Sequence, residues 1–85
     1  MTYSVEFKRS AQKQLERFPK NIQRRIADAI DALAENPRPQ GYIQMETDDI
    51  LYRIRVGDYR IIYEIIDNRL VVLVIRIGHR RDVYR

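Results

Sequence analysis

The chain has 85 residues, of which 45% are hydrophobic and 33% charged, with 16 basic and 12 acidic side chains and a net charge of +4. This length predicts a single domain, residues 1–85, and the absence of cysteine excludes disulfides, a thiolate nucleophile and the usual zinc and iron–sulfur sites. The first residues lack a secretion-signal pattern and no apolar run is long enough to span a bilayer, so we expect a cytoplasmic protein without membrane contact.

The first half of the chain predicts one strand followed by two helices. Apolar and polar residues alternate over residues 2–7, which is the period of a half-buried strand. Residues 8–18 have helical apolar spacing that Pro19 ends. Residues 20–36 carry one apolar stripe with charges on the opposite side, which predicts an amphipathic helix, and the prolines and glycine of residues 37–41 end it.

The second half predicts strands only. Residues 50–56, 59–66 and 70–77 are short apolar runs rich in β-branched and aromatic residues, with turn residues between them. Residues 42–49 are polar, and we expect a loop there. The resulting fold is α+β with the order β-α-α-β-β-β, in which two N-terminal helices pack on one face of a mostly antiparallel four-stranded sheet. The crossover through the helices is long enough for the first strand to pair in parallel or with a non-adjacent strand.

Alternation along the predicted strands places the tyrosines Tyr52, Tyr59 and Tyr63 on the helix side, as core residues. Four arginines are expected together on the opposite, open face: Arg53, Arg55, Arg60 and Arg76. By the same parity, four apolar residues would share that open face: Ile62, Ile66, Val72 and Val74.

The charge distribution favours an anionic partner for the open face. The excess of four positive charges lies wholly in residues 50–85, where all eight basic side chains are arginine. Guanidinium groups bind phosphate through paired, planar hydrogen bonds, whereas lysine serves equally well as a general solubilising residue. A solvated sheet face is the alternative interpretation of the same pattern.

The remaining chemistry points away from metals and cofactors. A single histidine, His79, cannot build a zinc site without cysteine, and the isolated glycines form no phosphate loop, so we expect neither metal nor cofactor. Arginines and tyrosines suit RNA, whose ribose 2′-hydroxyl is a built-in nucleophile that the protein need only orient and support. His79 is a candidate supplementary acid or base, because imidazole titrates near neutral pH.

Residues Leu51 to Glu64 (LYRIRVGDYRIIYE), followed by residues 71–84 (VVLVIRIGHRRDVY), resemble the RelE branch of the RelE/ParE toxin superfamily. The likeness also covers the first strand, both helices and the Asn-Pro helix stop. Members of that branch are toxins of type II toxin–antitoxin systems that enter the ribosomal A site and cut mRNA to a 2′,3′-cyclic phosphate. The resemblance therefore implies a metal-independent endoribonuclease that forms a hetero-oligomer with a cognate RelB-like antitoxin.

The resemblance also implies roles for individual residues. By position it assigns phosphate binding and charge stabilisation to Arg53, Arg55 and Arg60. It assigns protonation of the leaving group, or contact with the transition state, to Arg80, and orientation or stacking of the substrate to Tyr84.

Two further arginines, Arg76 and Arg81, are expected to contact the substrate. Two other functions remain open on the same fold. One is a ParE-like inhibitor of DNA gyrase, which would act on a protein and cut no RNA. The other is a basic RNA-binding module without catalytic activity.

Overall fold

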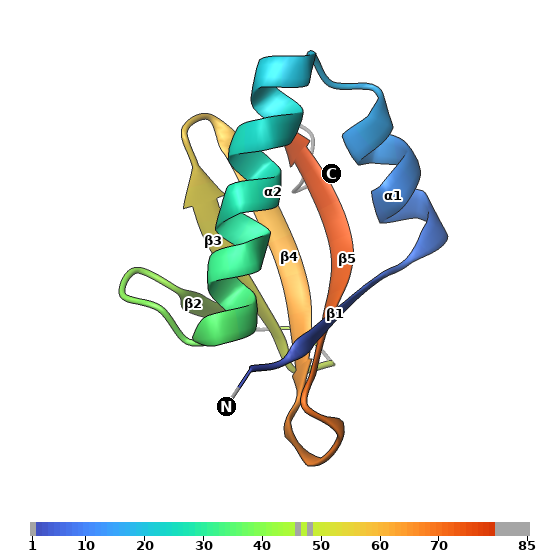
Figure 1. Cartoon of the computed structure of the whole chain (residues 1–85). Coiled ribbons are helices and arrows are strands. Elements are labelled where there is room, and N and C mark those ends of the chain that lie inside the picture. The colour runs from blue at the N-terminus through green and yellow to red at the C-terminus, as the bar shows by residue number, and fades with distance from the viewer. Residues whose placement is uncertain (1, 46, 48, 80–85) are drawn as a thin grey trace.

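The computed structural model describes residues 2–45, 47 and 49–79 of the chain. Both helices lie on one face of a single sheet (Figure 1). The elements in chain order are β1 (Ser4–Phe7), α1 (Arg9–Glu16), α2 (Lys20–Glu35), β2 (Ile43–Met45), β3 (Leu51–Val56), β4 (Tyr59–Ile66), a 3₁₀ turn (Asp67–Arg69) and β5 (Val71–His79). None of the helices in these described ranges combines the length and apolar character needed to cross a membrane.

The sheet has five strands in the order β1-β5-β4-β3-β2, and the predicted α+β fold with its helix pair on one face is confirmed. β1 runs parallel to β5, and every other neighbouring pair is antiparallel. The predicted strand count of four was too low, because Ile43–Met45 lies in the segment expected to be a loop. A strand of three residues with two exposed side chains has too little alternation for its period to be recognised.

α2 forms because its apolar side chains recur at helical spacing and can all be buried on one side. Ile26, Ile30 and Leu33 on this stripe are at most 3% exposed. They pack in one core cluster with side chains of the sheet's helix-facing side: Ile54, Ile61, Tyr63, Val72, Val74 and Ile77. Burying each large aliphatic side chain contributes about 1.5–3 kcal/mol, so the face of the sheet that points to the helices is fixed by this stripe.

Two glutamine side chains satisfy backbone groups that the helices and strands leave open. Gln23 Nε2 of α2 donates to the carbonyl oxygen of Phe18 at 2.8 Å, where the chain leaves α1. Gln14 Oε1 of α1 accepts from the backbone N–H of Ile77 at 2.9 Å. β1 pairs with β5 only as far as Val74, so this N–H lies beyond the end of β1 and α1 supplies its acceptor.

A β-bulge makes the distribution of apolar residues between the two faces differ from the predicted one. The β4–β5 register shifts between Ile62 and Tyr63, which leaves Ile75 as an extra residue on β5. The extra residue reverses the parity of β5 before it, so Val72 and Val74 belong to the helix-side core. Their expected place on the open face was wrong. Ile62 does lie on the open face and is nevertheless 5% exposed.

The β3–β4 hairpin turns through two residues, Gly57 and Asp58. Gly57 has a φ of +60°, which glycine adopts without strain, while Asp58 is not among the residues with positive φ. This combination is typical of a type II′ turn, whose twist matches that of the paired strands. The guanidinium of Arg25 on α2 lies against the turn, with Nη2 3.0 Å from the position of a Cβ on Gly57. The turn therefore fixes the register between β3 and β4, and with it the positions of their side chains on the open face.

Candidate functional site: an arginine-lined sheet face

Three strands bring arginines into two adjacent rows on the face of the sheet opposite the helices. Directly paired residues of antiparallel strands point to the same side, with Cβ atoms about 4.5–5.5 Å apart. Read across β3, β4 and β5, one row is Arg55, Arg60 and Gly78, and the next is Arg53, Ile62 and Arg76. The expectation that these four arginines share one face is confirmed. We refer to Arg53, Arg55, Arg60 and Arg76 as the arginine face.

Arg60 is the buried member of the arginine face, with 5% of its surface exposed. Its Nη1 donates to the carbonyl oxygen of Tyr59 at 3.3 Å. Its Nε is buried and has no hydrogen-bond partner among the residues that the structure describes. A buried cation with an unsatisfied donor is unfavourable unless an anion or acceptor meets it. Its neighbour Gly78 adds no side chain to the row, so space next to this guanidinium is not filled from β5.

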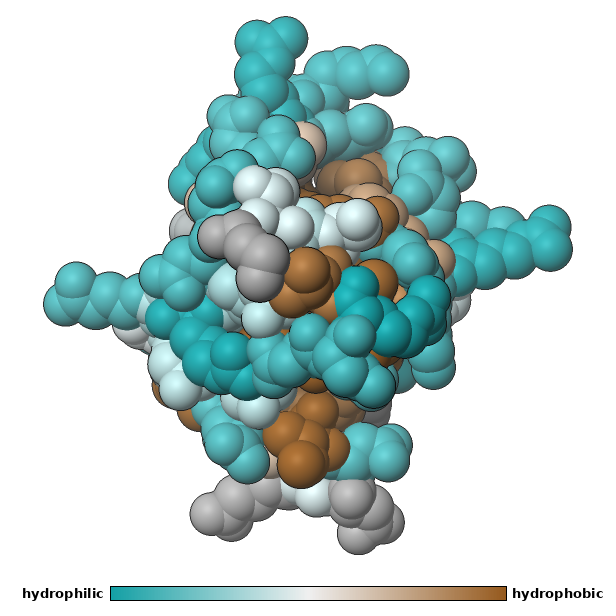
Figure 2. All heavy atoms as spheres, turned by 60° about the horizontal axis from the view of Figure 1, so that its bottom comes forward, coloured by the Kyte–Doolittle hydropathy of each residue, from teal (hydrophilic) through white to brown (hydrophobic). Residues whose placement is uncertain are grey.

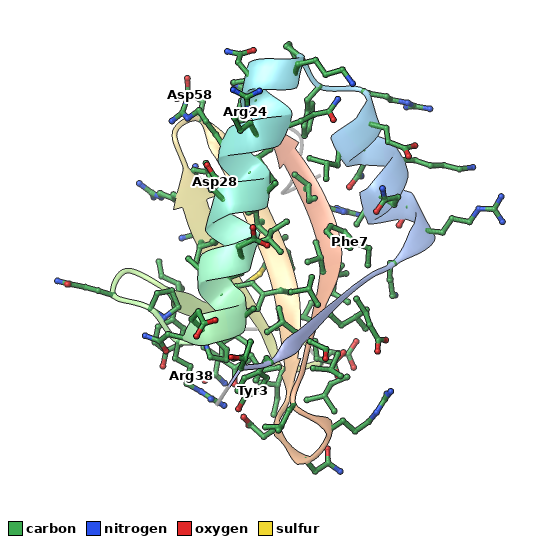
Figure 3. All side chains as sticks on the ribbon, in the orientation of Figure 1. Tyr3, Phe7, Arg24, Asp28, Arg38 and Asp58 are labelled. Carbon is green, nitrogen blue, oxygen red and sulfur yellow. The ribbon has the colours of Figure 1, made fainter. Side chains whose placement is uncertain are left out.

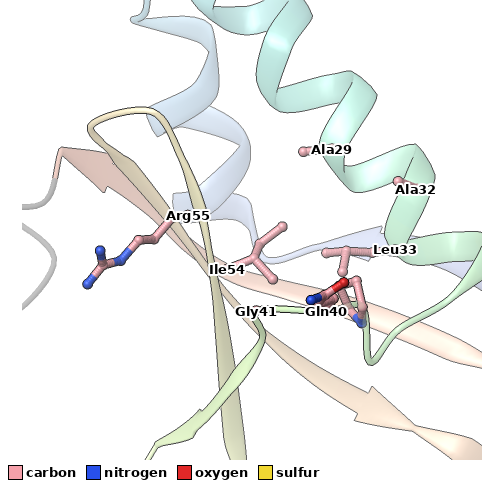
Figure 4. A pocket seen from close by; sticks show the side chains of 8 residues that line it. Ala29, Ala32, Leu33, Gln40, Gly41, Ile54 and Arg55 are labelled. Carbon is pink, nitrogen blue, oxygen red and sulfur yellow. The ribbon is translucent and has the colours of Figure 1, made fainter.

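The other three arginines of the face are more exposed to solvent than Arg60. Arg53 is half-buried, whereas Arg55 and Arg76 are exposed. Figure 4 shows Arg55 pointing away from α2 while its neighbour Ile54 points toward it. Guanidinium groups on adjacent strands repel one another, and an anion bound among them removes that repulsion. The arrangement is therefore suited to a multiply contacted oxyanion such as a phosphodiester.

His79 lies on the other side of the sheet from the arginine face. It pairs in register with Tyr59, whose side chain packs against the helix-side core. The two rings meet edge-on with centroids 5.7 Å apart, and the Phe18 ring also packs on Tyr59, with a centroid separation of 5.0 Å. The structure thus does not bring His79 together with the arginines, contrary to its expected place in the same site.

Three predicted site residues, Arg80, Arg81 and Tyr84, lie outside the described residues. Among the residues that the structure describes, no group of three or more histidine, cysteine, aspartate and glutamate side chains is placed to hold a metal ion.

Sequence reasoning missed a polar cluster at the opposite end of the sheet, near the β4–β5 turn (Figure 3). Asp67 accepts hydrogen bonds from the Tyr3 hydroxyl at 2.6 Å and from Arg38 Nη2 at 2.9 Å. The bonds from Arg38 and Tyr3 lower the pKa of Asp67, and the bond to Asp67 raises the pKa of Tyr3. These residues are far apart in the sequence and match no local motif. They tie β1 and the α2–β2 connection to the β4–β5 turn, so we assign them a structural role.

The tyrosines predicted to be core residues pack at the same end of the sheet or on the helix side. Tyr63 is fully buried, and its hydroxyl donates to the carbonyl oxygen of Pro37 at 2.7 Å. Burial raises the pKa of Tyr63 to about 12. Tyr52 lies between Tyr63 and Tyr42, with ring centroids 5.9 and 5.8 Å away. Viewed with this end turned forward, hydrophilic side chains project around a few hydrophobic ones (Figure 2).

Comparison with known proteins identifies the family. The family model described as the ParE toxin of the type II toxin–antitoxin system parDE matches residues 5–84. The chain belongs to the RelE/ParE toxin superfamily. It is 30% identical to a putative RelE-like toxin protein of Escherichia coli, over 99% of this chain and 92% of the relative. It is 26% identical to the mRNA interferase toxin RelE of Escherichia coli K12, with the same coverage of both chains.

A solved structure supports the same assignment. The toxin superposes on the archaeal RelE–RelB complex from Pyrococcus horikoshii OT3 with a TM-score of 0.83 and 34% identity, covering 98% of this chain and 100% of that one. The toxin is thus RelE-like and of the type II toxin–antitoxin class, with the helix pair and mixed sheet expected of that fold.

Proposed function

We propose that this toxin is a ribosome-dependent endoribonuclease that cleaves mRNA in the A site without a metal ion, and that a cognate RelB-like antitoxin inhibits it. The observation that carries the proposal is Arg60, a buried guanidinium with an unsatisfied Nε at the centre of the arginine face. The name of the relative, mRNA interferase toxin RelE, supports RNA as the substrate.

In the proposed reaction, the ribose 2′-hydroxyl attacks the adjacent phosphorus atom. The bond from phosphorus to the 5′ oxygen of the next nucleotide breaks, leaving a 2′,3′-cyclic phosphate and a 5′-hydroxyl. The attacking hydroxyl loses its proton to a base, and the leaving oxygen gains one. Arg53, Arg55 and Arg60 stabilise the negative charge that accumulates on the phosphorane oxygens. Arginine holds its own proton too tightly to act as the base.

The other assigned residues complete the proposed site. Arg76 extends the arginine face by one position and is suited to hold a neighbouring phosphate of the message. Arg80 and Tyr84 retain the roles that the family resemblance implies: contact with the leaving group, and stacking on or orienting the substrate. Arg81 is kept as a proposed substrate contact. We leave His79 out of the reacting groups because its ring lies against Tyr59 on the helix side.

The test is expression of the toxin followed by primer extension on a translated message. We expect codon-positioned breaks with the natural chain and a loss of about 10²–10³-fold in cleavage rate with Arg60→Gln, because a preorganised donor to the transition state is removed. Arg9→Ala, which removes an exposed arginine of α1, serves as the matched control and should cleave normally. Equal cleavage by Arg60→Gln and Arg9→Ala would contradict the site assignment.

The match to the ParE family model makes gyrase inhibition the second candidate function. Loss of DNA supercoiling activity in the presence of the toxin, with intact messages, would favour that function. Ribosome binding without breaks would favour an RNA-binding module that has no catalytic activity.

A further inference from the structure

The proposed cleavage reaction needs a group that accepts a proton. A ribose 2′-hydroxyl becomes a strong nucleophile when a base removes its proton during the attack. The arginines of the arginine face hold their own protons too tightly for this task. His79 lies on the helix side of the sheet, against the ring of Tyr59. A protein group that accepts this proton therefore has to share the open face with the arginines.

Glu64 is a carboxylate on that face. On β4, the central strand of the sheet (Figure 1), alternate residues from Arg60 onward point to the open face, so Ile62 and Glu64 lie on the same side as Arg60. Glu64 is the sole acidic residue in the described strands β3, β4 and β5. The strands that carry the arginine face thus offer one carboxylate to a bound substrate.

The position of Glu64 on β4 is next to the arginine face. Ile62 is directly paired with Arg53 on β3 and with Arg76 on β5. Glu64 follows Ile62 by two residues, about 6.8 Å along the strand, and so lies diagonal to Arg53 across the β3–β4 pair. A phosphate held by Arg53 and Arg60 above Ile62 is adjacent to the Glu64 carboxylate. The 2′-hydroxyl that attacks this phosphate belongs to the same nucleotide, so the carboxylate can reach it as well.

The surroundings of Glu64 leave its carboxylate available to a substrate. The side chain is half-buried and makes no ion pair with any residue that the structure describes. Its directly paired neighbour on β5 is the apolar Leu73. Glu6 of β1, the next carboxylate in the same row, is by contrast paired with Arg69 at 3.7 Å. The chain therefore places an uncompensated carboxylate beside its arginine cluster.

We propose that Glu64 is the general base of the cleavage reaction, a role that rests on the nuclease function proposed above. Its carboxylate takes the proton of the 2′-hydroxyl while the 2′-oxygen forms a bond to phosphorus. The bond from phosphorus to the 5′-oxygen breaks, and this oxygen keeps the electron pair and gains a proton from water. Protonated Glu64 then returns its proton to water, so the reaction consumes no co-reactant.

A base and a phosphate-binding residue respond differently to the loss of their charge. The Glu64 carboxylate repels the phosphates of the message, so Glu64→Gln should bind RNA more tightly, by about threefold for two charges about 7 Å apart in water. The same variant should cleave about 10²–10⁴-fold more slowly, because general-base catalysis is lost. Loss of an arginine weakens RNA binding and cleavage together. Tighter binding with slower cleavage is therefore the expected signature of the base.

The test uses the full toxin and ribosomes carrying a short message of defined sequence. Single-turnover cleavage at saturating toxin measures the rate of the chemical step. Binding is measured with a message that has 2′-deoxyribose at the cleavage site, because this message lacks the nucleophile and cannot be cut. Glu64→Asp keeps a carboxylate on a side chain that is shorter by one methylene group, so it should cleave faster than Glu64→Gln.

Glu6→Gln is the matched control, because it removes the same charge from the same face two strands away from β4. It should bind and cleave as the natural chain does. Equal cleavage rates for Glu64→Gln and Glu6→Gln would overturn the role of Glu64 and leave the nuclease function standing. So would slow cleavage by Glu64→Gln together with weaker binding, which would make Glu64 a structural residue of the face. Absence of cleavage by the natural chain would instead remove the nuclease function, and the base with it.

Discussion

The buried position of Arg60 favours the binding of an anion more than it favours the stability of the folded chain. Within the described part of the chain its Nε is buried without a hydrogen-bond partner, and its Nη1 makes a long bond of 3.3 Å to the carbonyl oxygen of Tyr59. Such groups are costly to bury, and replacing a buried charge by an apolar side chain of similar volume is often neutral or stabilising.

We therefore expect Arg60→Met to raise the free energy of unfolding, by about 1 kcal/mol, while it abolishes mRNA cleavage. Urea denaturation of the purified variant measures the first effect and primer extension the second. Arg55→Met, at an exposed position of the same face, should leave stability nearly unchanged. A less stable Arg60→Met variant would show that this arginine is needed for the fold.

A second buried polar group, the Tyr63 hydroxyl, has the opposite effect on stability because its partner is also buried. It donates to the carbonyl oxygen of Pro37, which lies in a buried residue. Tyr63→Phe should lower the free energy of unfolding by about 1–3 kcal/mol, since the carbonyl loses its donor. Tyr42→Phe, at an exposed ring of the same aromatic group, is the control and should cost much less. Similar losses in the two variants would refute this account.

At the scale of elements, the Gln14 side chain adds a hydrogen bond between α1 and the end of β5 to their apolar packing. Gln14 supplies the acceptor that β1 does not reach at Ile77. Gln14→Met should lower the free energy of unfolding by about 1 kcal/mol and speed amide exchange at Ile77. Gln14→Glu keeps an oxygen acceptor and should protect that amide. Fast exchange of the Ile77 amide in both variants would show that the hydrogen bond from Ile77 to Gln14 does not stabilise the end of β5.

The helices and the three long strands could be predicted from the sequence because each has a clear apolar period over six or more residues. The face of the arginines followed from the same period, since β3 and β4 are regular up to Ile62. β2 and the bulge at Ile75 could not be predicted. The first is too short to show a period, and the second is an extra residue whose effect depends on pairing with β4.

The place of His79 illustrates the same limit within the candidate site. The side of the sheet on which His79 lies depends on the register of β5 with β4, and the sequence alone does not give that register. The cluster of Tyr3, Arg38 and Asp67 was also beyond local reasoning, because its members come from three separate segments.

For the molecule as a whole, that cluster predicts how stability depends on pH. Hydrogen bonds from Arg38 and Tyr3 lower the pKa of Asp67 below that of an aspartate in the unfolded chain. The folded chain therefore binds the proton at lower pH than the unfolded chain does. This contribution to stability is complete above about pH 4 and is lost as the pH falls through the lowered pKa.

Asp67→Asn should consequently show a smaller loss of stability than the natural chain when thermal unfolding is followed from neutral pH to acid. Asp28→Asn, at an exposed carboxylate of α2, is the control and should follow the natural chain. Superimposable acid profiles for all three proteins would rule out the cluster as an acid-sensitive contact.

The parallel pairing of β1 with β5 has a consequence for synthesis. The first strand of the chain can join the sheet only when the last one is available, and β5 also contributes Arg76 to the arginine face. A nascent polypeptide still inside the exit tunnel has neither. We therefore expect translation products that stop before β5 to lack both the complete sheet and the complete arginine face.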